Sequence, residues 1–166
     1  MAGKGDMEQC RKLAKGAMKD KSALQCLKSM VESQGGDGRY VENPGLFHKA
    51  PLSREVKASE TGFITHMDTE GIGVASVMLG AGRNKKEDTI DYSAGILLEK
   101  KYGDSVREGE TIAVLYASHE ELFGPAMEKF LASCTLGKQM PEPEPLIFAR
   151  ISDAGVERRT IEEKIP

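Results

Sequence analysis

Tryptophan is absent from this sequence of 166 residues, and only 5% of the residues are aromatic. The chain therefore has few aromatic side chains with which to stack on bases or to form an aromatic cage around a cationic ligand. The three cysteines, Cys10, Cys26 and Cys134, are odd in number, far apart and without a C-x-x-C spacing. This pattern argues against a zinc site or a disulfide framework and is typical of reduced cytosolic thiols.

No apolar run approaches the length of a membrane-spanning helix, and the N-terminus lacks the apolar core of a signal peptide. Charged residues make up 30% of the chain, but the two signs nearly cancel at a net charge of −3. A nucleic-acid surface needs clustered lysine and arginine, so we expect neither a nucleic-acid nor a membrane partner. The composition favours a cytoplasmic globular protein of one domain, or one small domain plus part of another.

Two helices are predicted in the first third of the chain. Asp6 can cap the first helix, and Ser22 with Gln25 has the pattern of a capping box for the second, which Gly35 would end. Each helix carries apolar residues at helical spacing on one side. The two stripes are Cys10, Leu13, Ala14, Ala17, Met18 and Ala23, Leu24, Leu27, Met30, Val31. Two such helices bury little by themselves, so the stripes predict a partner surface.

The glycine-rich segment 36–51 is predicted to be a loop and a module boundary, after which the hydrophobic period changes to two. This change predicts an α+β unit. Its first helix, capped by Asp68 or Thr69, is weakened by Gly71 and Gly73. The segment GDSVREG has the composition of a hairpin turn. We expect strands around 54–58, 63–67, 94–104, 109–117 and 145–151, and helices at 69–79 and 120–133.

The segment LGAGRNKKEDTID, residues 79–91, resembles a phosphate-binding loop because two glycines precede three basic residues. A dinucleotide fingerprint needs a third glycine after a strand, and a Walker loop needs G-K-[ST]; both are absent. We expect instead that Gly80 ends a helix and that Arg83, Lys85 and Lys86 lie near the negative end of its dipole, within reach of two aspartates. The residues assigned to this structural loop are Gly80, Gly82, Arg83, Asp88 and Asp91.

The segment KKYGDSVREGETIAVL, residues 100–115, resembles the turn of biotinyl and lipoyl carrier domains. Those carriers present a lysine on the next hairpin, and VLYASHEEL has none. The sequence therefore argues against a carrier and retains only the expectation of a sandwich-like shape. The three histidines, His48, His66 and His119, are each isolated in sequence, which favours solvated or structural roles over a catalytic triad or a metal site.

Four segments, in this order, resemble the C-terminal part of pyrimidine-nucleoside phosphorylases, the thymidine phosphorylase family. They are MVESQGGD (30–37), TGFI (61–64), GIGVASVMLGAGRNKKEDTIDYSAGI (71–96) and KKYGDSVREGETIAVLYA (100–117). The resemblance extends from about Ala2 to Ile151. Lys21 departs from it, because the family often has a glycine between the two helices.

The resemblance implies a homodimeric two-domain enzyme in which phosphate splits a pyrimidine nucleoside into base and pentose 1-phosphate. Inorganic phosphate is the co-substrate, and neither a cofactor nor a metal is implied. The family's phosphate loop and base-binding residues lie in its N-terminal half, and this chain has no KHSTGG-like stretch. We therefore expect no catalytic and no substrate-binding residue here, and the missing N-terminal catalytic region as the partner.

The implied fold is an α/β-hammerhead with a barrel-sandwich-like half, preceded by a helical segment from the end of a catalytic α/β domain. The helical segment would span 1–50, the hammerhead domain 51–151, and a charged tail 152–166. We expect the chain to support the catalytic domain, with the loop at 79–91 as a candidate brace for the closed cleft, and to be inactive alone. A stand-alone protein-binding hammerhead module without catalysis is the alternative.

Overall fold

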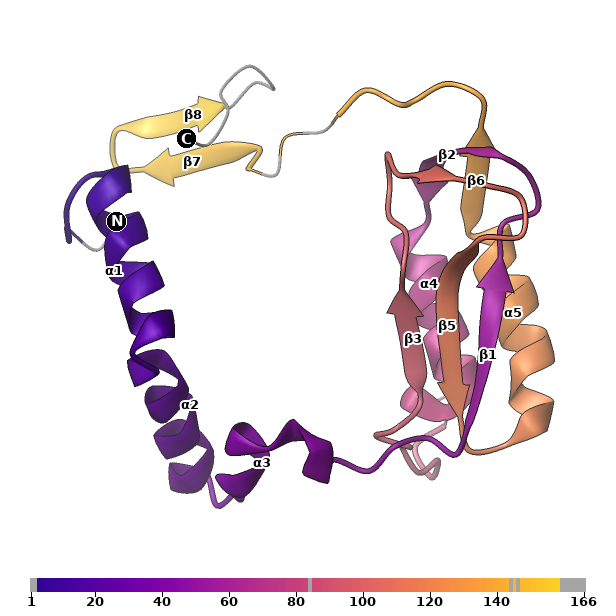
Figure 1. The fold of residues 1–166 in the computed structure, drawn as a ribbon, viewed down its shortest axis with the longest axis horizontal. Coiled ribbons are helices and arrows are strands. Elements are labelled where there is room, and N and C mark those ends of the chain that lie inside the picture. Colours follow the sequence, from indigo (N-terminus) through magenta and orange to yellow (C-terminus); the bar gives the residue numbers. More distant parts are fainter. Residues whose placement is uncertain (1–2, 84, 144, 146, 159–166) are drawn as a thin grey trace. The chain divides into compact units, whose positions relative to one another are not determined.

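The computed structural model describes residues 3–83, 85–143, 145 and 147–158 (Figure 1). The chain divides into two compact units, Met1–Lys49 and Ala50–Pro166. The first unit is helical, and the second contains the sheets. Together they make a mixed α+β chain, as the change of hydrophobic period predicts.

The first unit begins with a helix whose cap is the predicted one. The Asp6 carboxylate accepts from the Gln9 N–H at 2.8 Å, and the Gln9 side chain accepts from the Asp6 N–H at 3.1 Å. This reciprocal capping box satisfies two main-chain donors that a helix start leaves unpaired. The elements of this unit are α1 (Met7–Lys19), α2 (Ser22–Ser33), α3 (Arg39–Glu42) and a 3₁₀ turn, η1 (Pro44–Leu46). The predicted loop over 36–51 is therefore partly helical.

The start of α2 differs from the prediction. The capping residue is Lys21, which has a left-handed backbone with φ of 64° and makes no side-chain cap. Ser22 is already helical, and its N–H donates to the Asp20 carboxylate at 2.9 Å. The capping box expected from Ser22 and Gln25 was wrong because the chain turns one residue earlier. The end is as predicted, since Gly35 follows the helix with φ of 79°.

The apolar stripes of the first unit remain uncovered. Neither α1 nor α2 contains a buried residue. Leu13 is 57% exposed and Met18 is 76% exposed. The first unit therefore has no core of its own around these helices, as expected for helices that need a partner surface.

The second unit holds two three-stranded antiparallel sheets and a separate hairpin. The first sheet has the order β1-β5-β3, made of Leu52–Lys57, Thr111–Ala117 and Gly95–Leu98. The second has the order β4-β2-β6, made of Ser105–Val106, Gly62–Met67 and Cys134–Gly137. The hairpin pairs β7 (Ala149–Ser152) with β8 (Gly155–Arg158).

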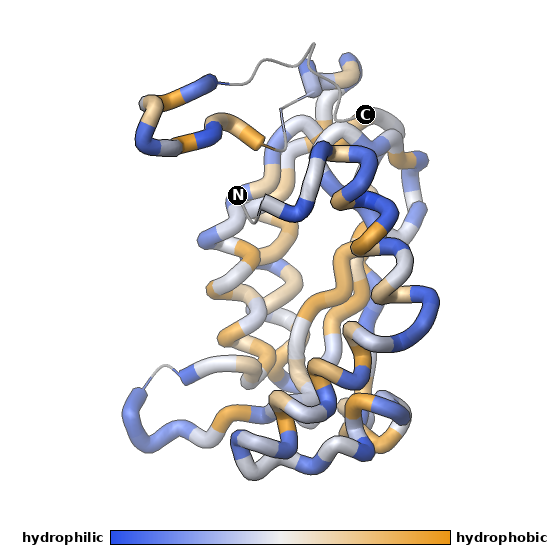
Figure 2. Tube along the Cα trace, turned by 90° about the vertical axis from the view of Figure 1, so that its left-hand side faces the viewer, coloured by the Kyte–Doolittle hydropathy of each residue, from blue (hydrophilic) through white to orange (hydrophobic). Residues whose placement is uncertain are grey.

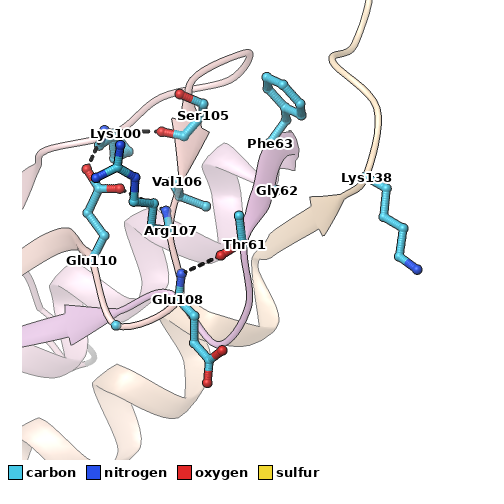
Figure 3. A pocket seen from close by; sticks show the side chains of 11 residues that line it. Thr61, Gly62, Phe63, Lys100, Ser105, Val106, Arg107, Glu108, Glu110 and Lys138 are labelled. Atoms are coloured by element: carbon cyan, nitrogen blue, oxygen red, sulfur yellow. Dashed lines mark hydrogen bonds and ion pairs between the residues drawn. The ribbon is translucent and has the colours of Figure 1, made fainter.

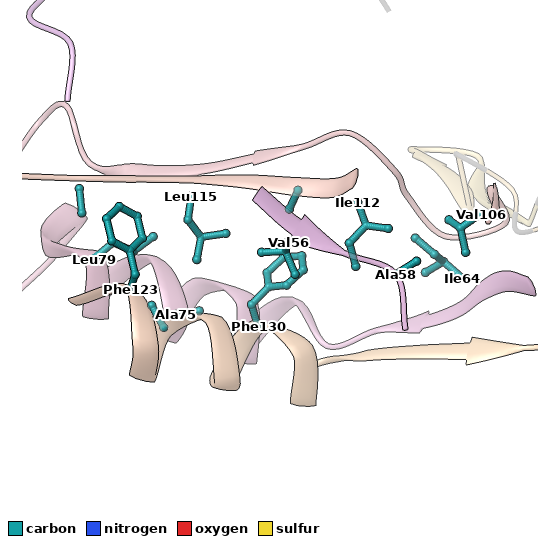
Figure 4. Packing of buried hydrophobic residues seen from close by; sticks show 13 residues of the cluster. Val56, Ala58, Ile64, Ala75, Leu79, Val106, Ile112, Leu115, Phe123 and Phe130 are labelled. Atoms are coloured by element: carbon teal, nitrogen blue, oxygen red, sulfur yellow. The ribbon is translucent and has the colours of Figure 1, made fainter. Parts of the chain in front are cut away.

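Two helices cover one face of the β1-β5-β3 sheet (Figures 1 and 4). They are α4 (Thr69–Ser76), which continues into a π-helical turn, η2 (Val77–Ala81), and α5 (Phe123–Ala132), which follows a 3₁₀ turn, η3 (Glu120–Leu122). Apolar side chains from both layers fill the space between them, with Phe130 fully buried. The core residues are Val56, Ala58, Ile64, Ala75, Leu79, Val106, Ile112, Ala113, Leu115, Ala117, Phe123, Ala126 and Phe130.

The close approach of α4 to the end of α5 depends on Gly71. A Cβ at this position would overlap Ser133 Oγ and lie 2.7 Å from Asp68 Oδ2. The Asp68 N–H also donates to the Ser133 carbonyl at 2.8 Å, although the Asp68 side chain makes no cap. Gly71 therefore lowers helix propensity, as predicted, but provides the space in which the two segments meet.

The strands and helices of the second unit mostly follow the sequence prediction, with three differences. GDSVREG does not form a tight hairpin: β3 and β5 pair as predicted, but β4 between them joins the other sheet. Neither β6 nor β8 was expected. The strand predicted at 145–151 starts at Ala149, and residue 146 lies outside the described residues. The tail at 152–166 is exposed as far as Arg158, and 159–166 lie outside the described residues.

Candidate functional site

The loop at 79–91 starts where the helical segment of α4 and η2 ends. Gly80 has φ of 103°, a left-handed backbone that favours glycine, and the chain becomes extended at Gly82. A side chain at Gly82 would press on Val77, with its Cβ 2.7 Å from Val77 Cγ2. The first glycine thus permits the turn and the second permits the close return of the chain, so neither requires a phosphate.

Asp91 fixes the other end of this loop. Its N–H donates to the Gly80 carbonyl at 2.9 Å. Its carboxylate accepts from the Ser118 hydroxyl at 2.5 Å, and from the Ser93 hydroxyl and N–H at 2.6 and 2.9 Å. These bonds, first that of Ser118 and then those of Ser93, lower the pKa of Asp91 to about 2. Asp91 therefore joins the helix end, the loop and the end of β5.

The basic residues of the loop do not pair with Asp91, contrary to the expectation. Arg83, Lys85 and Lys86 are exposed and form no ion pair within the described part of the chain. Asp88 accepts from the main-chain N–H of Lys85 at 2.9 Å. In Figure 2 the loop appears as a hydrophilic stretch beside its one undescribed residue. The structure therefore presents a cationic loop whose two ends are fixed by main-chain and Asp91 contacts.

The Gly-Asp turn of the carrier-like segment has a structural explanation at each motif position. Gly103 and Gly109 have φ of 87° and 78°. The Asp104 carboxylate accepts from the Lys101 N–H at 2.7 Å, which closes the turn. Val106 and Ile112 point into the core. This spacing thus encodes a turn that enters and leaves the β4-β2-β6 sheet.

An open groove lies beside this turn (Figure 3). Its residues come from the β1–β2 connection, β2, the segment between β3 and β4, β4 with the following turn, and the chain just after β6. They are Thr61, Gly62, Phe63, Lys100, Ser105, Val106, Arg107, Glu108, Gly109, Glu110 and Lys138. Charges of both signs line it, and Lys100 pairs with Glu110 at 2.7 Å. No nucleophile in this groove is hydrogen-bonded to a histidine, so its described side chains form no acyl-transfer constellation.

The histidines and cysteines do not gather into a site. His48, His66 and His119 are exposed, and they lie in a loop, in β2 and before η3. Cys10 and Cys26 are exposed, whereas burial raises the pKa of the Cys134 thiol. Within the described ranges, no group of three or more His, Cys, Asp or Glu side chains could hold a metal ion. None of the helices described has both the length and the apolar character that crossing a bilayer requires.

Comparison with known proteins identifies the segment that contains these turns. Residues 63–137 match the family model described as the pyrimidine nucleoside phosphorylase C-terminal domain. The chain carries the C-terminal domain of the pyrimidine-nucleoside phosphorylase family. The matched range runs from β2 to β6, so it includes the Asp91 network, the Gly-Asp turn and most of the groove.

Curated members of this family extend the similarity to most of the chain. The pyrimidine-nucleoside phosphorylase of Geobacillus stearothermophilus is 34% identical over 146 residues, 88% of this chain and 34% of that protein. Its counterpart in Staphylococcus haemolyticus (strain JCSC1435) is 43% identical over 116 residues, 70% of this chain and 27% of that protein. The chain thus spans about a third of the length of the curated phosphorylases it matches.

The sequence prediction missed the two serines that hold Asp91. Ser93 belongs to an Asp-Tyr-Ser segment, and an aspartate that accepts from the N–H two residues later is a common turn, so this bond was within reach of sequence reasoning. Ser118 lies 27 positions from Asp91. Only the pairing of β3 with β5 brings the two together, and no local pattern indicates it.

Proposed function

We propose that this chain is the C-terminal, architectural part of an enzyme that splits pyrimidine nucleosides with phosphate, giving the base and a pentose 1-phosphate. The observation that carries the proposal is the similarity to phosphorylases, which extends over 88% of this chain but only 34% of the Geobacillus protein. The remaining two thirds of such an enzyme would supply the catalytic region. The proposal makes that region the natural partner of this chain.

The chemistry of phosphorolysis explains why a second region is needed. Phosphate attacks C1′ while the bond to the base breaks, so the anomeric carbon gains positive charge and the base gains negative charge. Catalysis requires a positioned phosphate and donors aimed at the leaving base. The loop at 79–91 carries three cations, Arg83, Lys85 and Lys86. All three side chains are exposed, and they do not converge on a buried pocket.

The one tightly hydrogen-bonded carboxylate does not suit catalysis either. Asp91 has a pKa of about 2, far below the range of an efficient general base at neutral pH. The Ser118 hydroxyl donates to this carboxylate, and neither group is bonded to a histidine. Asp91 and Ser118 are therefore structural, which supports a chain without catalytic residues of its own.

The finer architecture belongs to the same proposal. We assign the second unit to an α/β-hammerhead with a barrel-sandwich-like half, and the first to the end of a catalytic α/β domain. The exposed stripes of α1 and α2 support a partner surface in the catalytic region. The cationic loop, fixed at Gly80 and Asp91, is suited to brace the closed cleft. The whole enzyme is proposed to be a cytoplasmic homodimer that uses inorganic phosphate and no cofactor.

An assay of the purified chain tests this function. Incubated alone with uridine or thymidine and phosphate, the chain should release no base above the rate without protein. Chromatography of the free base provides the measurement, and arsenate in place of phosphate provides a second nucleophile. Phosphate-dependent base release by the chain alone would overturn the architectural role.

A stand-alone binding module remains the second candidate, favoured by the uncovered apolar residues of the first unit such as Leu13 and Met18. The two candidates differ in their genes. An open reading frame that continues upstream of Met1 and encodes a Gly/Ser-rich phosphate loop supports the enzyme. A natural start at Met1 in a genome with a separate, complete phosphorylase gene favours the module.

A further inference from the structure

The outer edge of β4 lies beside the open groove and is covered by side chains instead of another strand (Figure 3). β4 pairs with β2 through Gly62 with Val106 and Phe63 with Ser105. The Asp104 carbonyl also accepts from the Ile64 N–H at 3.0 Å, on the β2 side. Main-chain groups alternate direction along a strand, so those of Ser105 and Arg107 point to the opposite, open side.

Two ion-paired side chains form hydrogen bonds with these outward-pointing main-chain groups. Lys100 Nζ donates to the Ser105 carbonyl at 3.1 Å, and Glu110 Oε2 accepts from the Arg107 N–H at 2.8 Å. The same side chains pair with each other, with Lys100 Nζ 2.7 Å from Glu110 Oε1. The Glu110 N–H donates to the Arg107 carbonyl at 2.9 Å, which fills a third outward group. The Lys100 ammonium thus bonds to a main-chain acceptor of the β4 edge, and the Glu110 carboxylate bonds to a main-chain donor.

The ion pair is held in this place by the chain on both sides. The Lys100 N–H donates to the Ile112 carbonyl at 3.1 Å, and the Ala58 N–H donates to the Glu110 carbonyl at 2.8 Å. The pair is only partly exposed, at 25% for the Lys100 and 36% for the Glu110 side chain. Lys100 lowers the pKa of Glu110, and the Arg107 N–H lowers it further, so the carboxylate stays charged at neutral pH.

We propose that Lys100 and Glu110 form an edge guard: they keep β4 and its groove closed to strand addition by a second copy of this chain. A free strand edge beside an open groove is a template for an added strand. With the Ser105 carbonyl and the Arg107 N–H and carbonyl already bonded, an incoming strand would first have to displace the guard. The groove therefore remains a surface without a main-chain partner.

A charge-swapped variant separates the guard from an ordinary ion pair. Lys100→Glu with Glu110→Lys keeps the net charge and can keep the ion pair, but it faces the Ser105 carbonyl with a carboxylate and the Arg107 N–H with an ammonium. Lys28→Ala with Glu42→Ala is the control, because it removes another ion pair, at 2.8 Å, that joins the helices α2 and α3. Sedimentation velocity of the full chain at matched concentrations compares both with the wild type.

We expect the swapped variant to self-associate about tenfold more tightly than wild type, the effect of about one net hydrogen bond. Exchange of the Ser105 and Arg107 amides should become slower as its concentration rises, which places the new contact on β4. The Lys28/Glu42 control should sediment as wild type does. A folded swapped variant that sediments like wild type, with amide exchange at 105 and 107 independent of concentration, overturns the proposal.

A second pair of variants covers the case in which the swapped chain fails to fold. Lys100→Met keeps most of the apolar side chain but removes the ammonium and frees the Ser105 carbonyl, so it should raise association in the same direction. Glu110→Gln keeps an acceptor for the Arg107 N–H and should associate less than Lys100→Met. Equal association of both single variants and wild type contradicts the edge guard.

Discussion

The Ser118 hydroxyl donates to Asp91 Oδ2 across 2.5 Å. This bond connects the end of β5 to a residue whose N–H holds the Gly80 carbonyl at the end of η2. One residue therefore holds both ends of the cationic loop: the main-chain N–H of Asp91 bonds to Gly80 at one end, and its carboxylate bonds to Ser93 and Ser118 at the other.

Asp91→Asn should lower the free energy of unfolding at pH 7 by about 1–2 kcal/mol, because the amide replaces a charged acceptor of three hydrogen bonds. The pKa of Asp91 is lowered from 3.8 to about 2 in the folded chain. The stabilisation is therefore complete above pH 3.8 and is lost as the pH falls through about 2. Urea unfolding across this range measures it, with the exposed turn residue Asp153→Asn as control. An equal effect of Asp91→Asn at pH 7 and pH 2 would contradict the assignment.

Gly71→Ala and Gly73→Ala test the packing of α4. Both remove a helix-weakening glycine, but only Gly71 faces Ser133 and Asp68, while a Cβ at Gly73 meets nothing within 4 Å. Gly73→Ala should stabilise the chain by about 0.5–1 kcal/mol, whereas Gly71→Ala should destabilise it by about 1–3 kcal/mol. Thermal unfolding gives both values. Stabilisation by Gly71→Ala would show that the helices can move apart at no cost.

Lys21→Gly should stabilise the first unit. Lys21 is the one non-glycine residue with positive φ among the residues described, at 64°, and the family resemblance given above implies a glycine at this position. Relief of the left-handed strain should contribute about 0.5–1 kcal/mol, after the larger backbone entropy of glycine in the unfolded chain is subtracted. Amide exchange in α2 is the readout. Lys21→Ala is the control and should not stabilise.

Leu13→Lys should change the stability of this chain by less than about 0.5 kcal/mol, because Leu13 is 57% exposed. Phe130→Ala, in the core of the second unit at 0% exposure, should cost about 3–5 kcal/mol. Denaturant unfolding compares the two. If Leu13 instead proves as sensitive as Phe130, α1 is covered in solution by another copy, and sedimentation of the variant would then show a smaller species.

The sequence predicts local structure well where a side chain near in sequence decides it. Asp6 caps α1, and Gly35 and Gly80 end helical segments, because each acts on the backbone close to it in sequence. The pairing of strands that lie far apart in the chain could not be predicted from the sequence. β6 is a four-residue strand whose partner, β2, precedes it by more than 60 positions, and β4 leaves the apparent hairpin to join the same sheet.

In the candidate site, too, local features could be predicted and long-range contacts could not. The glycines and the Gly-Asp turn follow from local backbone needs, whereas Ser118 reaches Asp91 only through the pairing of β3 with β5. The cap at Ser22 was misplaced because Lys21 adopts a backbone that lysine rarely takes. The edge guard likewise depends on Lys100 and Glu110 meeting across a turn, which spacing alone does not indicate.

A chimera tests the central claim most directly. The C-terminal third of the Geobacillus stearothermophilus phosphorylase, the part that this chain matches, is replaced by this chain, and phosphate-dependent release of base from uridine and thymidine is measured. We expect the chimera to regain activity that the truncated enzyme lacks, and Leu13→Lys, which this chain alone tolerates, to reduce that activity at least about tenfold by weakening the interface. A folded chimera without activity, beside a wild-type enzyme active in the same assay, would contradict the account of this chain as the architectural part of a pyrimidine-nucleoside phosphorylase.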